Sequence, residues 1–190
     1  MKFLIFFFIS NILFSDNNPY STFTSFMKSQ DGEVFDIYFH QGQYGENLSS
    51  YGKILLEPSE KITFDNESIR IVYNNSIIKT VNKKTKQIIY DNRIVEEITV
   101  FDLLYGTKSS LVPYKVKNNG NISTIFFEIT DFNMKGNLDI VAVTGEPTKI
   151  TLYDNFNNKT FIDIKKSVVK RDVLISIIDT TFYEIIDLRE

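Results

Sequence analysis

The chain consists largely of short segments in which apolar and polar residues alternate, separated by residues that favour turns. The stretch ITLYDNFNNKTFIDI shows the pattern, because Ile150 and Leu152 alternate with polar residues before a polar turn, and Phe161 or Ile162 begins a second alternation that reaches Ile164. Period-two alternation is typical of strands with one covered face and one wet face. The pattern leaves open whether a sheet, a helix or a ligand covers the apolar face.

The order of these segments predicts a mainly β fold of the α+β class. Roughly ten strand-like segments follow one another at short spacing, and the last two cover residues 171–179 and 180–188. A short amphipathic helix is expected over Tyr20–Lys28, after Pro19. A second is expected in the stretch IVEEITVFDLLYGTKSS, where Gly106 stops the helical pattern. We therefore expect an antiparallel sheet or barrel with helices on one face.

The first fifteen residues form a separate segment. They carry Lys2 and then an apolar run that is too short to span a bilayer comfortably, so residues 1–15 are expected to be a cleavable secretory signal peptide. A buried N-terminal strand or an uncleaved anchor is the alternative. Residues 16–190 are then expected to be a single domain that is exported, soluble and periplasmic. The chain has no cysteine, so neither a disulfide nor lipid attachment through a lipobox cysteine is available to it.

The residue types give little support to an enzyme. His40 is the only histidine, and the sequence contains no HExxH, P-loop or GxGxxG motif. We expect no catalytic function, no cofactor and no metal. The formal net charge of −3 argues against nucleic-acid binding. A small basic cluster, Lys83, Lys84 and Lys86, is expected to be a solvated turn, with a docking patch as the alternative.

Six local segments follow the predicted signal and first helix, and they cover nearly the whole predicted mature chain. They are IYFHQ, YGKILLEPSEKITFD, NNSIIKTVNKKTKQIIY, VFDLLYG, LDIVAVTGEPTKITLYDNFNNKTFIDI and TTFYEI. In this order they resemble the periplasmic outer-membrane lipoprotein carrier family, LolA. The chain departs from the family at Thr63, where the family usually has an arginine that helps to hold the helical lid.

The resemblance implies a fold and a function. The fold would be an incomplete antiparallel barrel curled around short lid helices. The function would be that of a monomeric carrier that binds the acyl chains of lipoproteins in an apolar cavity and shuttles them from the inner to the outer membrane. Its expected partners are acylated lipoprotein cargo, an inner-membrane ABC-type lipoprotein-releasing complex and an outer-membrane acceptor lipoprotein.

Candidate lipid-binding residues follow from the same comparison. The cavity-wall candidates are Phe64, Ile69, Ile71, Tyr73, Ile89 and Tyr90, and the lid candidates are Phe101 and Leu104. The phase of each strand decides which alternate set faces inward, because a shift of one residue reverses the faces.

Two other classes of protein are compatible with the sequence. The first is a secreted β-rich interaction or envelope-structural module with a filled core and no ligand. The second, a glycosidase-like enzyme, would need two carboxylates in one cleft. An apolar cavity would distinguish the carrier from both.

Overall fold

A computed structural model describes most of the chain. The described residues are 18–30, 32–43, 46–57, 61–74, 76–94, 100–105, 111–130, 133–153, 158–169, 171–174 and 178–189. Residues 1–15, for which the sequence predicts a signal peptide, lie outside them.

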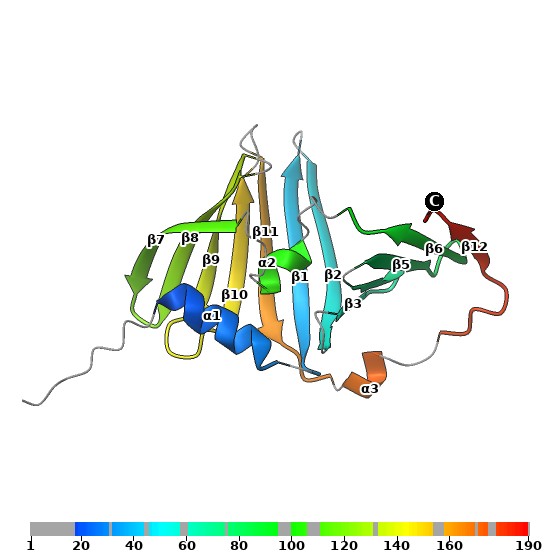
Figure 1. The fold of residues 1–190 in the computed structure, drawn as a ribbon, viewed down its shortest axis with the longest axis horizontal. Helices are drawn as coiled ribbons and strands as arrows, with labels where there is room; N and C mark the ends of the chain where they lie inside the picture. The colour runs from blue at the N-terminus through cyan, green and yellow to red at the C-terminus, as the bar shows by residue number, and fades with distance from the viewer. Residues whose placement is uncertain are drawn as a thin grey trace, which may run out of the picture.

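Three helices and twelve strands make up the described fold (Figure 1). The helices are α1 (Pro19–Lys28), α2 (Val100–Tyr105) and α3 (Arg171–Leu174). The strands are β1 (Val34–Gln43), β2 (Glu46–Glu57), β3 (Lys61–Asp65), β4 (Ile69–Tyr73), β5 (Ile77–Asn82), β6 (Gln87–Asn92), β7 (Leu111–Asn119), β8 (Ile122–Ile129), β9 (Met134–Val141), β10 (Pro147–Tyr153), β11 (Lys159–Lys166) and β12 (Glu184–Asp187).

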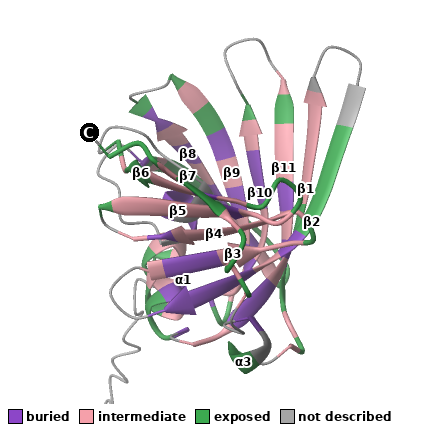
Figure 2. Cartoon of the chain, turned by 90° about the vertical axis from the view of Figure 1, so that its right-hand side faces the viewer, coloured by how far each residue is buried: buried purple, intermediate pink, exposed green. Residues whose placement is uncertain are grey.

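All twelve strands belong to one curled sheet, in the order β12-β6-β5-β4-β3-β2-β1-β11-β10-β9-β8-β7. In Figure 2 the strands β3 to β5 run across the direction of β1, β10 and β11, so the sheet turns strongly around its inner side. The edges β7 and β12 are not paired with each other. The expected incomplete barrel is therefore confirmed.

The helices α1 and α2 lie on the same side of the sheet, which we call the inner face (Figure 1). Asn18 begins α1, since its side-chain oxygen accepts a hydrogen bond from the Tyr20 amide at 3.0 Å, and Pro19 suits the first helical position. Phe23 and Met27 are one helical turn apart and both are buried. Their burial anchors α1 against the sheet.

The inner face of β7 to β11 and β1 forms the main core with α1 and α2. Ile150, Ile162 and Ile164 point into this core, whereas Phe161 lies on the other face, which settles the strand phase that the sequence left open. The buried members that surround them include Phe23, Met27, Phe35, Ile37, Leu103, Leu104, Ile125, Phe127, Ile129, Leu138 and Ile140. Over this half of the molecule, protein side chains cover the apolar face.

The structure corrects two expectations. Residues 171–174 form the helix α3, where the sequence predicted a strand, and Leu174 packs against Val34 and Leu55 on the outer face. The final strand β12 pairs with β6 in parallel, so the sheet is not wholly antiparallel. Helix α2 covers residues 100–105 of the stretch in which the sequence predicts a helix, and residues 95–99 and 106–110 lie outside the described part.

Candidate functional site

An apolar cavity of about 400 Å³ lies on the inner face, between the main core and the strands β3 and β4. This volume is in the range of small-molecule binding sites. Its described lining residues are Ile37, Phe39, Ser50, Ile54, Phe64, Ile69, Ile71 and Ile162. Ser50 is the only polar side chain among them, so the lining suits a hydrocarbon ligand rather than a polar one.

Three of the predicted wall residues come together at this cavity. Phe64 and Ile71 are cross-strand partners on β3 and β4, and Ile69 is two residues before Ile71 on the same face. Ile54 on β2 pairs with Phe64 and continues the same row. The row gives the cavity a wall that extends over three strands.

The other predicted wall residues have different positions. Ile89 belongs to the same inner row, two strands beyond Ile71, but the described lining does not include it. Tyr73 is buried in the main core. Adjacent residues of a strand point to opposite faces, so Tyr90 lies on the outer face. There its ring centroid is 5.5 Å from the Lys79 ammonium. Tyr90 is therefore not part of the inner wall.

The two predicted lid residues belong to α2. Leu104 is buried in the main core together with Leu103. The side chain of Phe101 lies outside the described part of the structure. An acidic substitution at Leu104 would thus place a charge in the core and disturb folding as well as ligand uptake.

Sequence reasoning missed five of the eight described lining residues. They are Ile37, Phe39, Ser50, Ile54 and Ile162, and all five lie in segments that the sequence predicts to be strands. Their alternation shows that they share a face, but it does not show which strands enclose an unfilled space.

A buried polar cluster attaches α2 to the sheet. The Arg93 guanidinium is 2.5 Å from Asp102 of α2, and the Tyr73 hydroxyl donates to the same carboxylate at 3.1 Å. Arg93 also lies over the Tyr73 ring, at 4.7 Å from its centroid. One atom of the cluster, Arg93 Nε, is buried without a hydrogen-bond partner among the described residues, which lowers the free-energy cost of undocking α2.

Thr63 has no part in this attachment. It is buried on the outer face, where its hydroxyl donates to Glu57 at 3.2 Å. Glu57 also accepts from Lys61 at 2.9 Å and is 3.5 Å from Arg171 of α3. The position at which the LolA family usually carries a lid-holding arginine therefore joins β2, β3 and α3 on the side away from α2.

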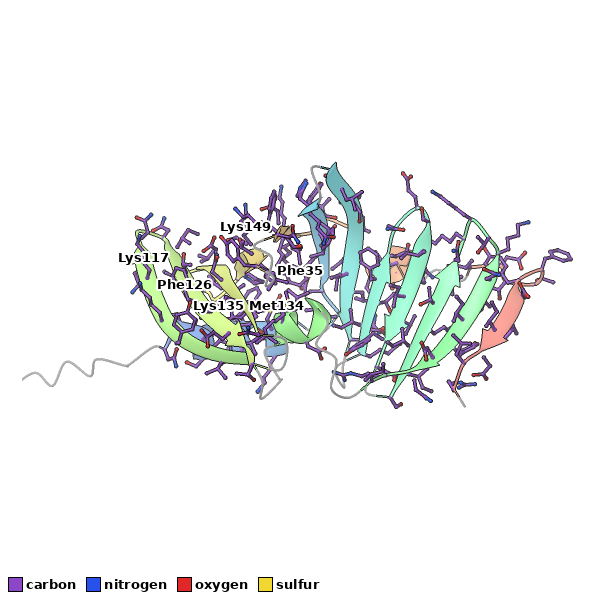
Figure 3. The ribbon with its side chains drawn as sticks, turned by 90° about the horizontal axis from the view of Figure 1, so that it is seen from above. Phe35, Lys117, Phe126, Met134, Lys135 and Lys149 are labelled. Carbon is purple, nitrogen blue, oxygen red and sulfur yellow. The ribbon has the colours of Figure 1, made fainter. Side chains whose placement is uncertain are left out.

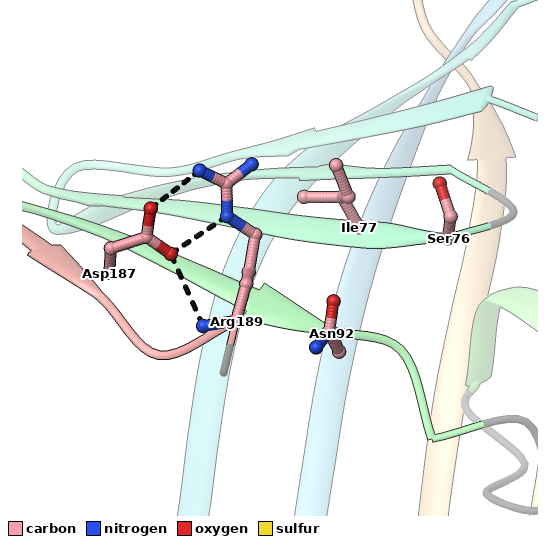
Figure 4. Close-up of a pocket in the computed structure, with 5 residues that line it drawn as sticks. All are labelled: Ser76, Ile77, Asn92, Asp187 and Arg189. Carbon is pink, nitrogen blue, oxygen red and sulfur yellow. Dashed lines mark hydrogen bonds and ion pairs between the residues drawn. The ribbon is translucent and has the colours of Figure 1, made fainter.

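A second, polar hollow lies near the C-terminal end of the chain, lined by Ser76, Ile77, Asn92, Asp187 and Arg189 (Figure 4). Arg189 forms two hydrogen bonds with the Asp187 carboxylate, at 2.7 and 2.5 Å. The hydrogen bond from Arg189 lowers the pKa of Asp187 to about 2. Since the cation is already paired, this hollow has no free charge to offer to an anion.

His40 has a serine and an aspartate beside it on the outer face. Its Nδ1 is 3.0 Å from the Ser49 hydroxyl, and its Nε2 is 3.9 Å from Asp163. The second distance exceeds a hydrogen bond, so Asp163 does not orient the imidazole as a triad aspartate does. Phe161 stacks on the His40 ring at 4.9 Å, which gives the imidazole a packing role in the sheet surface.

Comparison with known proteins identifies the fold. No protein-family model and no curated protein matches this chain. Among solved structures, an uncharacterized conserved protein from Thermus thermophilus matches 88% of this chain and 98% of its own, with 8% identity and a TM-score of 0.54. This likeness shows a shared fold.

Other solved structures that the chain resembles include a LolA superfamily protein and a lipoprotein-sorting protein domain. A LolA superfamily protein from Nitrosomonas europaea matches 83% of this chain and 96% of its own, with 7% identity and a TM-score of 0.43. A putative outer membrane lipoprotein-sorting protein domain from Vibrio parahaemolyticus matches 78% and 94%, with 9% identity and a TM-score of 0.39. None of the helices in the described residues has the length and apolar composition of a membrane span.

Proposed function

We propose that this protein is an exported, non-enzymatic carrier that binds the acyl chains of lipoproteins in the inner-face cavity and shuttles them through the periplasm from the inner to the outer membrane. The cavity carries the proposal, because eight residues line about 400 Å³ that no described side chain fills, and seven of the eight are apolar. The pairing of Ile54, Phe64 and Ile71 makes one wall continuous.

The physical need for such a carrier is large. Each methylene group exposed to water costs about 0.8 kcal/mol, so an acyl chain does not cross an aqueous compartment unaided. An apolar cavity lowers this cost and still permits release, which requires only that the next acceptor bind the chain more tightly. In this proposal the donor is an inner-membrane ABC-type releasing complex, the acceptor is an outer-membrane lipoprotein, and the carrier acts as a monomer.

Ser50 and its neighbour Ser49 allow a matched test. Ser50 lines the cavity from β2, whereas Ser49 is on the opposite face of the same strand. We expect Ser50→Trp to fill the cavity and to reduce release of newly made lipoproteins from spheroplasts by about tenfold or more, since a filled site excludes the chain. The same bulk at Ser49→Trp should leave release unchanged. The measurement is the amount of lipoprotein recovered in a soluble complex with the exported protein.

Two results would contradict the proposal. The first is failure of the unsubstituted, folded protein to release lipoproteins in the presence of its cognate membrane machinery. The second is equal release by the Ser50→Trp and Ser49→Trp variants, which would place the binding site elsewhere. Both variants substitute exposed serines, so thermal unfolding curves close to that of the parent are expected and will confirm that the comparison concerns binding.

A further inference from the structure

Helices α1 and α2 pack on the inner face of the sheet, so they leave the outer face of β7 to β11, β1 and β2 uncovered (Figure 1). On that face, Leu174 of α3 packs against Val34 and Leu55. The strand register aligns one residue from each of these seven strands in a continuous row on this face. The row is Lys115, Phe126, Asn137, Thr151, Phe161, His40 and Ser49. Figure 3 labels Phe126 in this half of the sheet.

A second row runs beside it and contains two lysines and two tyrosines. It consists of Lys117, Thr124, Asp139, Lys149, Asp163, Tyr38 and Tyr51. Tyr38 and Tyr51 are both 45% exposed, and their rings lie 4.8 Å apart. Lys117 and Lys149 of this row are labelled in Figure 3. The two rows together, apart from the terminal Ser49, whose hydroxyl is hydrogen-bonded to His40, are the outer-face platform.

Lysine ammonium groups lie over the aromatic rings of the platform. Lys115 is 5.6 Å from the centroid of Phe126, and Lys149 and Lys159 are 4.6 and 5.6 Å from that of Phe161. Lys53 is similarly placed, 5.1 Å from the centroid of Tyr51. Cation–π attraction keeps these ammonium groups close to the rings, so a partner that binds this face contacts lysines and aromatic rings together.

Part of this positive charge is neutralised within the protein, and part is not. Lys53 pairs with Asp36, Lys149 with Asp163, and Lys135 with Glu128. Burial works against the charge on Asp36, but hydrogen bonds from Lys53, Tyr51 and Ser167 outweigh it and lower the pKa of that carboxyl, so the pair stays charged at neutral pH. Among the described residues no carboxylate forms an ion pair with the remaining lysines of this face, Lys115, Lys117, Lys159 and Lys165.

We propose that the outer-face platform docks the protein on a membrane surface that contains anionic phospholipid. Unpaired lysines attract the headgroup phosphates, and Tyr and Phe rings favour the boundary between headgroups and acyl chains. The whole chain has a formal net charge of −3 and would otherwise be repelled by such a surface. The local excess of lysine therefore determines that the protein approaches the membrane with its outer face. The docking extends the proposed carrier role but rests on the opposite face and does not depend on the occupant of the cavity.

The test uses sedimentation of the exported protein with vesicles of phosphatidylcholine alone and with equal parts of phosphatidylcholine and phosphatidylglycerol. We expect binding to the anionic vesicles only, and weaker binding as salt concentration rises. The double substitution Lys115→Glu with Lys159→Glu should reduce the partition coefficient by about tenfold or more, because each lysine near an anionic surface contributes separately.

A matched control separates the platform from total charge. Lys84→Glu with Lys86→Glu changes the net charge equally, but both residues lie in the exposed turn between β5 and β6. This control should retain binding. Equal loss in both double variants, or equal binding to neutral and anionic vesicles, would overturn the proposal. Binding to an acidic protein but not to vesicles would also overturn it, in favour of a protein partner.

Lys115 and Lys159 are both exposed on the outer face, so folding is expected to survive their substitution. The independent pair Lys117→Glu with Lys165→Glu repeats the test at other sites of the same face. Retained vesicle binding in both folded double variants would contradict the platform even if the carrier function holds, because lipoprotein release is measured separately. Loss of lipoprotein release in the Ser50→Trp variant, with vesicle binding intact, would show that this substitution affects the cavity and not the platform.

Discussion

Single residues gain their roles here from the face of the strand on which they lie. Ile89 and Tyr90 are neighbours in the chain, yet Ile89 belongs to the inner row and Tyr90 to the outer surface. Ser49 and Ser50 differ in the same way. The residue type alone does not distinguish them, because serine and tyrosine are compatible with either face of a half-buried sheet.

Asp102 joins α2 to the sheet, and its removal tests that attachment. We expect Asp102→Asn to destabilise the fold by about 3 kcal/mol, since it leaves the largely buried Arg93 without its carboxylate partner. Urea unfolding followed by circular dichroism measures the change. If α2 acts as a lid, the same variant should also exchange an apolar dye from the cavity faster than the parent.

Asp91 provides the control for this substitution. It is exposed on β6, and its carboxylate accepts only the Asn92 amide among the described side-chain hydrogen bonds. We expect Asp91→Asn to change the free energy of unfolding by no more than roughly 0.5 kcal/mol. Similar unfolding curves for both variants would show that the Arg93–Asp102 pair does not hold α2.

At the scale of elements, two glycines let aromatic rings approach neighbouring strands closely. A Cβ atom at Gly136 would be 2.7 Å from the Phe127 ring and 2.7 Å from the Thr151 carbonyl oxygen. A Cβ atom at Gly52 would overlap the Phe64 ring in the same way. Gly52 thus allows Phe64 to lie over β2, where it forms part of the cavity wall.

Gly136 therefore controls the fit between β8, β9 and β10. We expect Gly136→Val to destabilise the protein by about 2 kcal/mol, because the backbone oxygen of Thr151 cannot move aside as a flexible side chain could. Thermal or urea unfolding measures the loss. Asn137→Val, one residue further and on the outer face, should be nearly neutral. A stability of the Gly136→Val protein equal to that of the parent would show that the strands adjust without cost.

At the scale of the whole molecule, the sheet has a filled half and an open half. Helices α1 and α2 cover the inner face of β7 to β11, whereas Ile69, Ile71, Ile78 and Ile89 on β4 to β6 remain only half-buried. The filled-core and cavity alternatives that the sequence left open thus each describe a part of the same sheet.

Local stability should follow this division. We expect backbone amides of β8 to β10 to exchange with deuterium at least about tenfold more slowly than those of β4 and β5, because fewer apolar contacts resist opening in the second group. Hydrogen exchange followed by NMR measures the rates residue by residue. Equal protection across the sheet would show that the open half is as tightly held as the filled half.

The sequence by itself determined the strand-rich class, the position of α1 and the presence of a hairpin between Ile150 and Ile164. These depend on local patterns, namely alternation, the proline at the helix start and turn residues. Only the tertiary structure decided that Phe64, Ile69 and Ile71 enclose a space, that Thr63 faces away from α2, and that β12 runs parallel to β6. Those features depend on strand phase and on contacts between distant segments, and a local pattern contains neither.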